Sequence, residues 1–301
     1  MASTLLRVLW RLWVTERIIR ESAPAKVNLF LRVLGRRADG FHEIETLVQP
    51  VTLADGVEAR AVDEGLHLDV VGGHAKGVPL GDDNLALRAA GVLADEAGVT
   101  RGARLLLVKH IPVAAGLGGG SADAAAALRA LNLLWGCGLA PEDLARLAAK
   151  VGSDVPALLG GGPVLARGKG ERVEPVRIVR TWWVLVTHSF PVRAGDAYAW
   201  WDEYGGPVGR DPARLVAALQ QDDPAAVGRL LSNDLEGPVS AKYQDVRAAR
   251  GALLEAGALG AVMCGSGPTV AGLARDGRHA EELAAAVGGT AVASISGIPA
   301  G

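Results

Sequence analysis

The sequence is poor in cysteine and has no pattern that usually binds zinc. Its two cysteines, Cys137 and Cys264, lie far apart, with neither a Cys-x-x-Cys pair nor a histidine-rich segment. This argues against a disulfide framework and against a zinc site, and it favours a cytoplasmic protein. Cys264, beside Gly265, could lie near a ligand, although a buried free thiol is the commoner arrangement.

An excess of charge of one sign is also missing, because the formal net charge is −2. A nucleic-acid-binding surface usually needs a basic excess, so we expect no nucleic-acid partner. Half of the residues are hydrophobic and 21% are charged, which is typical of a globular protein. A chain of 301 residues is long enough for two domains, each with its own core.

The beginning of the chain, residues 1–20, has no uninterrupted apolar run. Apolar residues gather between Leu5 and Val14, but Arg11 divides them into pieces that suit neither a signal peptide nor a membrane span. An amphipathic surface helix is one interpretation. We prefer an extension without function, and we expect no membrane partner.

Apolar periodicity predicts strands and helices in an α+β arrangement. The predicted strands are 17–22, 27–34, strands within 45–62 separated by the turn dipeptide Asp55-Gly56, 66–71, 103–109, 163–166, 182–187, 259–264, 269–274 and 290–295. The predicted helices are 84–97, 121–135, 141–151, 211–221, 223–232, 241–256 and 278–287. Glycines cluster near 160–180, where we place the seam between two domains.

The most distinctive segment is 112–132, where four glycines within 116–120 precede Ser121 and an alanine-rich run. A loop without side chains lets backbone N–H groups approach a ligand. The predicted helix behind it directs its positive dipole end to the same place, so the segment predicts a phosphate-binding loop. It is not a P-loop, because Gly-Lys-Ser/Thr is missing, and it is not a dinucleotide fingerprint. Ser121 could cap the helix, contact a phosphate oxygen or Mg²⁺, or do both.

Three further segments accompany this loop: 23–31, with Lys26 and Asn28; 152–156, with Asp154; and 264–269. In this order they resemble the GHMP kinases, the superfamily of galactokinase, homoserine kinase and mevalonate kinase. The resemblance covers about residues 22–275. It implies an α+β, two-domain GHMP kinase fold, with a ribosomal protein S5 domain 2-like domain over 21–167 and a ferredoxin-like domain over 168–298.

The segment Asp39-Gly40-Phe41-His42-Glu43 is similar to that of one branch of the superfamily, in the non-mevalonate isoprenoid pathway. This likeness implies ATP-dependent phosphorylation of the 2-hydroxyl of 4-diphosphocytidyl-2-C-methyl-D-erythritol. An aromatic ring offers cytosine a stacking surface worth ~1–3 kcal/mol, and a histidine can pair with the base edge. Outside this pattern, His42 would be read as an ordinary surface histidine.

The resemblance also assigns roles in catalysis. Asp154 would orient the substrate hydroxyl and take its proton, and Lys26 beside it would keep the carboxylate ionised. An isolated lysine in a strand is usually solvated, but Lys26 has apolar neighbours in the sequence. Asn28 would share its strand face and bind substrate or fix the lysine.

The resemblance implies contacts to both ligands and to a supporting turn. The implied ATP-binding residues are Asn84, Lys109, Pro112, Val113, Ala114, Ala115, Gly116, Leu117, Gly118, Gly119, Gly120, Ser121 and Ala122. The implied substrate-binding residues are Asn28, Phe41, His42, Tyr198 and Trp200, with Trp200 alternatively a core residue and either Tyr198 or Trp200 stacking on the cytosine. The implied supporting turn is Gly265, Ser266 and Gly267. Asp123, in the first helical turn, is expected to be structural.

The chain departs from the family pattern at four places. Phe41 replaces the usual tyrosine, which keeps the stacking ring and loses a phenolic hydrogen bond. Ala115 narrows the conformational freedom of the loop. Ala157 stands where the family commonly has a phenylalanine, which could loosen the packing behind Asp154. The segment 193–196 stands where the family tends to have small hydroxyl residues, so the sequence does not decide which substrate contacts that segment makes.

Two other functions fit parts of the sequence: a different GHMP kinase, such as one for homoserine or mevalonate, and a nucleotide or sugar sensor on the same fold. The segment 39–42 argues against the first, and the presence of both Lys26 and Asp154 argues against the second. The preferred hypothesis implies ATP with Mg²⁺, for which Ser121 is a weak candidate ligand. It also implies a small-molecule substrate and no obligate protein partner.

Overall fold

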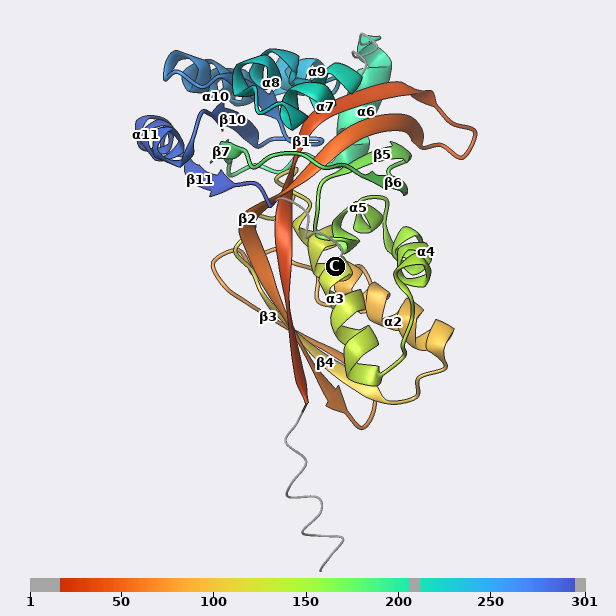
Figure 1. Cartoon of the computed structure of the whole chain (residues 1–301). Coiled ribbons are helices and arrows are strands. Elements are labelled where there is room, and N and C mark those ends of the chain that lie inside the picture. Colours follow the sequence, from red (N-terminus) through yellow and green to blue (C-terminus); the bar gives the residue numbers. More distant parts are fainter. Residues whose placement is uncertain (1–16, 206–211, 296–301) are drawn as a thin grey trace, which may run out of the picture.

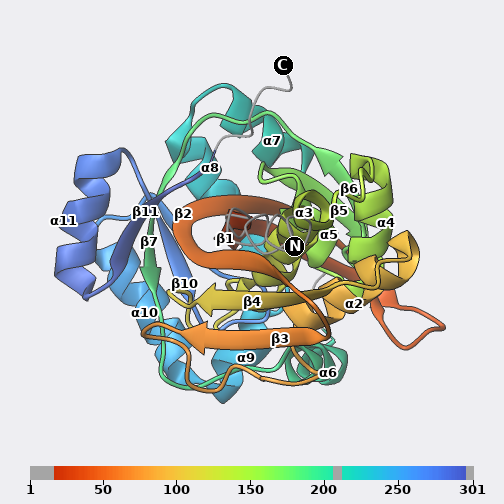
Figure 2. The ribbon, with the colours of Figure 1, turned by 90° about the horizontal axis from the view of Figure 1, so that it is seen from below.

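The computed structural model describes residues 17–205 and 212–295, which form two sheets and the helices around them. In Figure 1 the long strands β1 (Ile18–Arg36) and β2 (His42–Val62) run through the molecule. Helices α2 to α5 lie toward one end of these strands, and helices α6 to α11 lie toward the other. Figure 2 shows α11 and α4 on opposite sides of the same strand pair. Within these ranges, no helix has the length and apolar character needed to cross a bilayer.

The first sheet has seven strands in the order β3-β4-β2-β1-β8, with β5 paired to β2 and β6 paired to β5. Its remaining strands are β3 (Leu66–Val71), β4 (Gly102–Val108), β5 (Val164–Gly168), β6 (Arg172–Pro175) and β8 (Ser232–Asn233). Because β8 comes from the second half of the chain, this sheet already joins both halves.

The predictions for 17–22, 27–34 and 45–62 were wrong in one respect, because β1 and β2 are each continuous. Pro24 lies inside β1, where its missing N–H coincides with an irregular step in the pairing with β2. Asp55 and Gly56 lie inside β2 and pair with β1. Both residues keep strand pairing in place of a turn, and the Asp55 carboxylate accepts hydrogen bonds from the His110 and Ile111 N–H groups.

The helices on the first sheet form an alanine- and leucine-rich core with it. They are α2 (Leu85–Ala97), α3 (Gly119–Trp135), α4 (Pro141–Val151) and α5 (Val155–Leu159). Most residues of α3 are buried, and its small side chains let it lie close to the sheet strands and α2. Helix α3 therefore holds the loop before it in a fixed place beside β1 and β2.

The second sheet has four antiparallel strands in the order β11-β7-β10-β9, the order of a ferredoxin-like fold. The strands are β7 (Trp182–Val186), β9 (Gly260–Met263), β10 (Val270–Ala274) and β11 (Thr290–Ala293). The helices of this half are α6 (Ala194–Tyr204), α7 (Ala213–Gln220), α8 (Pro224–Leu230), α9 (Glu236–Lys242), α10 (Gln244–Glu255) and α11 (Gly277–Val287). The sequence did not predict α6, and the predicted helix 241–256 overlaps two helices, α9 and α10.

The two sheets share a buried cluster in which Val27 and Leu47 of the first sheet pack with Trp183 and Leu185 of the second. The predicted domain boundary at 167/168 falls within the β5–β6 hairpin, whose strands both belong to the first sheet. Most of the predicted extension, residues 1–16, lies outside the described residues. Residues 18–20, however, already pair with β2 as part of β1.

Candidate active site

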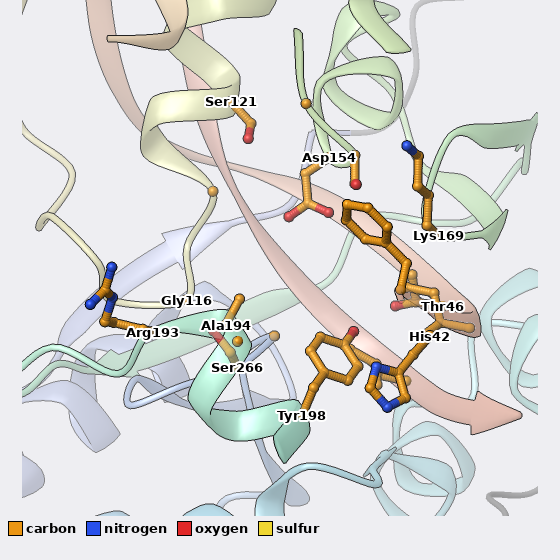
Figure 3. A pocket seen from close by; sticks show the side chains of 18 of the residues that line it. His42, Thr46, Gly116, Ser121, Asp154, Lys169, Arg193, Ala194, Tyr198 and Ser266 are labelled. Carbon is orange, nitrogen blue, oxygen red and sulfur yellow. The ribbon is translucent and has the colours of Figure 1, made fainter. Parts of the chain in front are cut away.

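A cavity of about 830 Å³ lies where the glycine loop, β1, β2, α6 and the β5–β6 hairpin meet (Figure 3). The predicted residues that line it are Lys26, Asn28, Phe41, His42, Ala114, Gly116, Gly118, Ser121, Asp154, Tyr198, Gly265 and Ser266. Segments separated by more than two hundred residues in the sequence are thus brought to one place.

A second cavity, of about 260 Å³, lies against the glycine loop and contains the other predicted nucleotide contacts. It is lined by Asn84, Lys109, Pro112, Val113, Ala114, Ala115, Gly116, Gly118, Gly119, Gly120 and Ser121, among others. Of the predicted ATP-binding residues, Leu117 and Ala122 line neither of these two cavities, and both side chains are buried. Since the cavities share Ala114, Gly116, Gly118 and Ser121, a ligand on the loop would reach both.

The glycine loop has a backbone that requires glycine at two positions. Gly116 and Gly118 have positive φ values of 78° and 72°. A Cβ at Gly116 would lie 2.2 Å from the carbonyl oxygen of Cys264, and the Thr269 N–H donates to the Ala115 carbonyl. The turn 265–267 therefore packs directly on the loop, as a supporting turn would.

Ser121 does not cap the following helix, contrary to one of its two interpretations. Gly118 occupies the N-cap position, and no side chain in the described part of the chain forms a capping hydrogen bond there. Because Gly118 adopts a left-handed conformation, the helix begins at Gly119, two residues earlier than predicted. Ser121 lies in the first turn and lines both cavities, so its hydroxyl is directed to a ligand site.

Lys26 and Asp154 face one another, with 4.0 Å between Nζ and the nearer carboxylate oxygen. The Lys26 side chain is buried, and the Asp154 side chain is 51% exposed. Lys26 Nζ also donates to the Gly116 carbonyl at 2.8 Å and to Asn28 Oδ1 at 2.7 Å. The ammonium is thus fixed between the glycine loop and the carboxylate, which Figure 3 shows directed into the cavity.

Asn28 holds Lys26 in place through a buried chain of hydrogen bonds. Its Nδ2 donates to Thr46 Oγ1 at 2.9 Å, and that hydroxyl donates to the Phe30 carbonyl at 2.6 Å. Lys26 and Asn28 therefore share a strand face, as predicted. A Cβ at Gly265 would lie 2.7 Å from Lys26 Nζ, so the supporting turn closes this side of the ammonium.

The supporting turn is held by a residue that the sequence did not single out. Asn233 Nδ2 donates to the carbonyls of Met263 and Gly265, both at 2.7 Å. Burial raises the pKa of Cys264 to about 12, so this neighbour of the turn remains a neutral thiol. Cys264 is therefore a packing residue and not a nucleophile.

The aromatic side of the cavity is formed by Phe41, His42 and Tyr198, and Figure 3 shows His42 beside Tyr198. The Phe41 ring is half exposed, with Lys169 Nζ 4.6 Å from its centroid. His42 stacks on Tyr198, with 4.8 Å between ring centroids, and its Nε2 lies 2.8 Å from Asp202 Oδ1. The histidine is thus held by α6 and is not a loose surface side chain.

Trp200 was predicted to bind substrate, but it is absent from the cavity lining among the described residues. It lies two residues after Tyr198 on α6, and two helical positions turn a side chain to the far side of a helix. The Trp200 ring instead lies near Tyr243 and Lys242. Of the two aromatic candidates, the structure places Tyr198 alone at the cavity.

Asn84 and Lys109 border the second cavity, but their polar atoms have protein partners. Asn84 caps α2 by accepting from the Ala86 N–H, and it donates to the Pro79 carbonyl. Lys109 Nζ is buried between the carboxylates of Asp55 and Asp123. Burial raises the pKa of Asp123 to about 7, opposed by the lysine and aided by the Asp55 charge. Asp123 was expected in the first helical turn, but α3 begins at Gly119 and its first turn contains no acidic residue. The Asp123 carboxylate instead pairs with Lys109 inside the protein.

The cavity also contains cationic residues that the sequence analysis did not assign. Arg36, Lys169 and Arg193 line it, from the end of β1, the β5–β6 hairpin and the start of α6. A Cβ at Gly170 would lie 3.0 Å from the Ser153 carbonyl, so this hairpin contacts the segment that carries Asp154. A signal existed for Arg193, since it departs from the family pattern, whereas the place of Lys169 depends on hairpin geometry.

Comparison with known proteins identifies the family. A model of the GHMP kinases N terminal domain matches residues 84–162, and one of the GHMP kinases C terminal matches 215–293. A 4-diphosphocytidyl-2-C-methyl-D-erythritol kinase of Pelotomaculum thermopropionicum is 45% identical over 276 residues, covering 89% of this chain and 93% of that protein. The chain belongs to the GHMP kinases, in the branch of these erythritol kinases. The corresponding kinase of Moorella thermoacetica is 44% identical, covering 87% and 92%.

Solved structures agree with this GHMP kinase assignment. A crystal structure of a 4-(cytidine 5'-diphospho)-2C-methyl-D-erythritol kinase is 36% identical with a TM-score of 0.78, covering 93% of this chain and all of that one. A homoserine kinase from Cytophaga hutchinsonii has a TM-score of 0.74 at 22% identity, covering 94% and 96%, which shows the shared fold only. The predicted fold class is confirmed.

Proposed function

We propose that this GHMP kinase transfers the γ-phosphoryl group of ATP to the 2-hydroxyl of 4-diphosphocytidyl-2-C-methyl-D-erythritol, a step of the non-mevalonate route to isoprenoids, giving the 2-phosphate and ADP. One observation carries the proposal. The Lys26–Asp154 pair, 4.0 Å apart beside the glycine loop, lies in the same cavity as the half-exposed Phe41 ring. A sensor would need the loop and the ring but not the pair.

The glycine loop is the proposed seat of the triphosphate. Its backbone N–H groups and the N-terminus of the 17-residue helix α3 offer donors and a positive dipole end to phosphate oxygens. The loop borders both cavities, so the adenosine would occupy the second cavity and the γ-phosphate would face Asp154. Asn84 and Lys109 would then shape the nucleotide pocket.

Asp154 is the proposed base for the substrate hydroxyl. Phosphoryl transfer depends mainly on positioning and on charge stabilisation, with a carboxylate orienting the nucleophile and accepting its proton. Lys26, held by Asn28 and the Gly116 carbonyl, keeps a positive charge beside that carboxylate. The same ammonium lies next to the loop, where it would also attract the transferred phosphoryl group.

ATP acts in kinases together with Mg²⁺, which neutralises charge on the β- and γ-phosphates. Within residues 17–205 and 212–295, no group of three or more His, Cys, Asp or Glu side chains is arranged to hold a metal ion. This suits an ion held chiefly by the phosphates, as Mg²⁺ commonly is. Ser121, at the helix start and facing both cavities, is the side chain that would contact it.

The cytidyl part of the substrate fits the aromatic side of the cavity. Phe41 offers a stacking face, and His42, fixed by Tyr198 and Asp202, offers its ring edge to the base. The cations Arg36, Lys169 and Arg193 would balance the charge of the diphosphate. Both substrates are small molecules, so the proposed reaction needs no protein partner. The enzyme would act in the cytoplasm.

Separate substitutions of the catalytic pair test the proposed roles. Asp154→Asn and Lys26→Met should each lower kcat by about 10²–10⁴, the usual size of acid–base contributions, while binding of a non-hydrolysable ATP analogue persists. Turnover is followed by ADP release, and phosphorus NMR shows whether a new phosphomonoester forms. Asp69→Asn, which alters an exposed carboxylate paired with Arg104, is the matched control. Near-normal turnover in either catalytic variant would refute its role.

A further inference from the structure

Asp55 lies in the middle of β2 with its side chain completely buried, outside both ligand cavities of the described chain. The pairing of β2 with β4 ends at Gly56 and Val108, one residue short of Asp55. Beyond that point the Asp55 carboxylate replaces the backbone ladder. Its Oδ1 accepts from the His110 N–H at 2.5 Å and from the Ile111 N–H at 2.8 Å. Asp55 thus directs the chain from β4 into the glycine loop.

The second Asp55 oxygen connects the far end of the loop. Oδ2 accepts from Lys109 Nζ, and the same ammonium donates to Asp123 Oδ2 of helix α3 at 2.5 Å. The residues before and after the glycine loop are therefore tied to one buried cluster, Asp55–Lys109–Asp123. The loop between them has both ends fixed.

The start of α3 also rests on this cluster. A Cβ at Gly119 would lie 3.1 Å from Ile111 Cγ2 and 3.6 Å from Asp55 Oδ2. The N-terminal turn, with the N–H groups proposed to bind phosphate, is thus seated on Ile111 and on the carboxylate that holds Ile111. A shift of the Asp55 carboxylate would move the loop entry and the helix start together.

We infer that Asp55 is a positioning residue for nucleotide binding, whose carboxylate sets the glycine loop at the distance that the triphosphate requires. The inference deepens the proposed function and rests on its assignment of the loop to ATP. It gives Lys109 a role beneath the nucleotide pocket, through Asp55 and Asp123. The role also accounts for the burial of the Asp55 carboxylate within a strand. A buried charge without a partner would be costly, and Lys109 supplies the partner.

The test measures binding of a non-hydrolysable ATP analogue by calorimetry, together with separate KM values for ATP and the cytidyl substrate. Asp55→Asn removes the charge that Lys109 needs while keeping the side-chain shape. We expect the dissociation constant for the analogue to rise about tenfold or more, since small displacements of binding groups are costly. The KM for the cytidyl substrate should stay within about twofold, because Asp55 does not line its cavity.

Two controls separate positioning from a general loss of stability. Leu93→Ala opens the buried core behind α2 and should lower the unfolding midpoint without selective loss of nucleotide affinity. Glu58→Gln changes an ion-paired carboxylate elsewhere on β2 and should leave nucleotide affinity unchanged. Nucleotide affinity of Asp55→Asn equal to that of wild type, or reduced no more than in Leu93→Ala, would overturn the inference.

If Asp55→Asn does not fold, Gly119→Ala decides. The added methyl group would press on Ile111 and should produce the same selective loss of analogue affinity; wild-type affinity in that variant would contradict the inference. Analogue binding is measured without the second substrate. A wild-type enzyme that binds nucleotide but does not phosphorylate the cytidyl substrate would therefore disprove the proposed function and leave the role of Asp55 intact.

Discussion

At the scale of single residues, the site depends on charges whose surroundings are specified by other side chains. Lys26 is the clearest example, since its ammonium is held by an amide, a backbone carbonyl and a carboxylate at once. The sequence indicated Lys26, Asn28 and Asp154 through their motifs. It did not indicate Lys169 or Asp202, because their contacts arise from a hairpin and a helix distant in the sequence.

The aromatic side of the site gives a prediction for substrate choice. Phe41→Ala should raise the KM for the cytidyl substrate about 5- to 150-fold, the equivalent of losing a stacking contact of ~1–3 kcal/mol, and should leave the KM for ATP unchanged. Steady-state kinetics with each substrate varied in turn measure both values. Phe41→Tyr keeps the ring and serves as control. An equal effect of Phe41→Ala on both KM values would remove Phe41 from the cytosine site.

Asp123 gives a prediction for the pH dependence of stability. Its pKa in the folded protein is about 7 against 3.8 for an ordinary aspartate, chiefly because of burial. Between these values the folded state binds a proton that the unfolded state has lost. This group therefore makes the protein less stable as pH rises from about 4 to about 7, by at most about 1.4 kcal/mol per pH unit.

Urea unfolding of wild type and Asp123→Asn at pH 5 and pH 8 tests this. The free energy of unfolding of wild type, minus that of the variant, should be larger at pH 5 than at pH 8. Asparagine resembles the protonated acid and does not titrate, so the comparison isolates Asp123. A difference that is constant with pH, or larger at pH 8, would contradict the raised pKa.

At the scale of elements, the glycine loop packs directly against the supporting turn. Gly116→Ala would place a methyl group 2.2 Å from the Cys264 carbonyl oxygen, at a φ of 78°. We expect a loss of about 1–3 kcal/mol or more in the free energy of unfolding and weaker nucleotide binding. Gly91→Ala, in α2 with open space around it, should bind nucleotide normally and unfold no more easily. Equal stability of the two variants would show that the loop and turn do not need their close contact.

The elements themselves were largely predictable where one period dominates. Helices α2, α4 and α11 and strand β3 agree with the predicted ranges within about two residues, since each has a clear apolar pattern. The start of α3 was misplaced because a left-handed Gly118 replaces a side-chain cap. Asp55-Gly56 was mistaken for a turn because local propensity cannot reveal that His110 and Ile111 supply the partners of that carboxylate.

At the scale of the whole molecule, the two sheets cooperate in building one cavity. Lys26 lies on β1, His42 begins β2, and Phe41 directly precedes it. Helix α6 and the turn 265–267, which complete the cavity, come from the second half of the chain. The family resemblance anticipated this meeting of segments, while composition and periodicity alone did not. From the sequence alone, the glycine loop is predicted only to bind phosphate. Its proposed role in binding ATP depends on the residues that the fold places around it.

The central claim is the choice of phosphoryl acceptor. ADP release, measured by a coupled assay at fixed ATP, should be compared for 4-diphosphocytidyl-2-C-methyl-D-erythritol, homoserine and mevalonate. We expect kcat/KM for the cytidyl substrate to exceed the other two by at least about a hundredfold, because they lack the base and diphosphate for which the cavity offers contacts. No ADP release with the cytidyl substrate, or a higher kcat/KM for homoserine or mevalonate, would contradict the account.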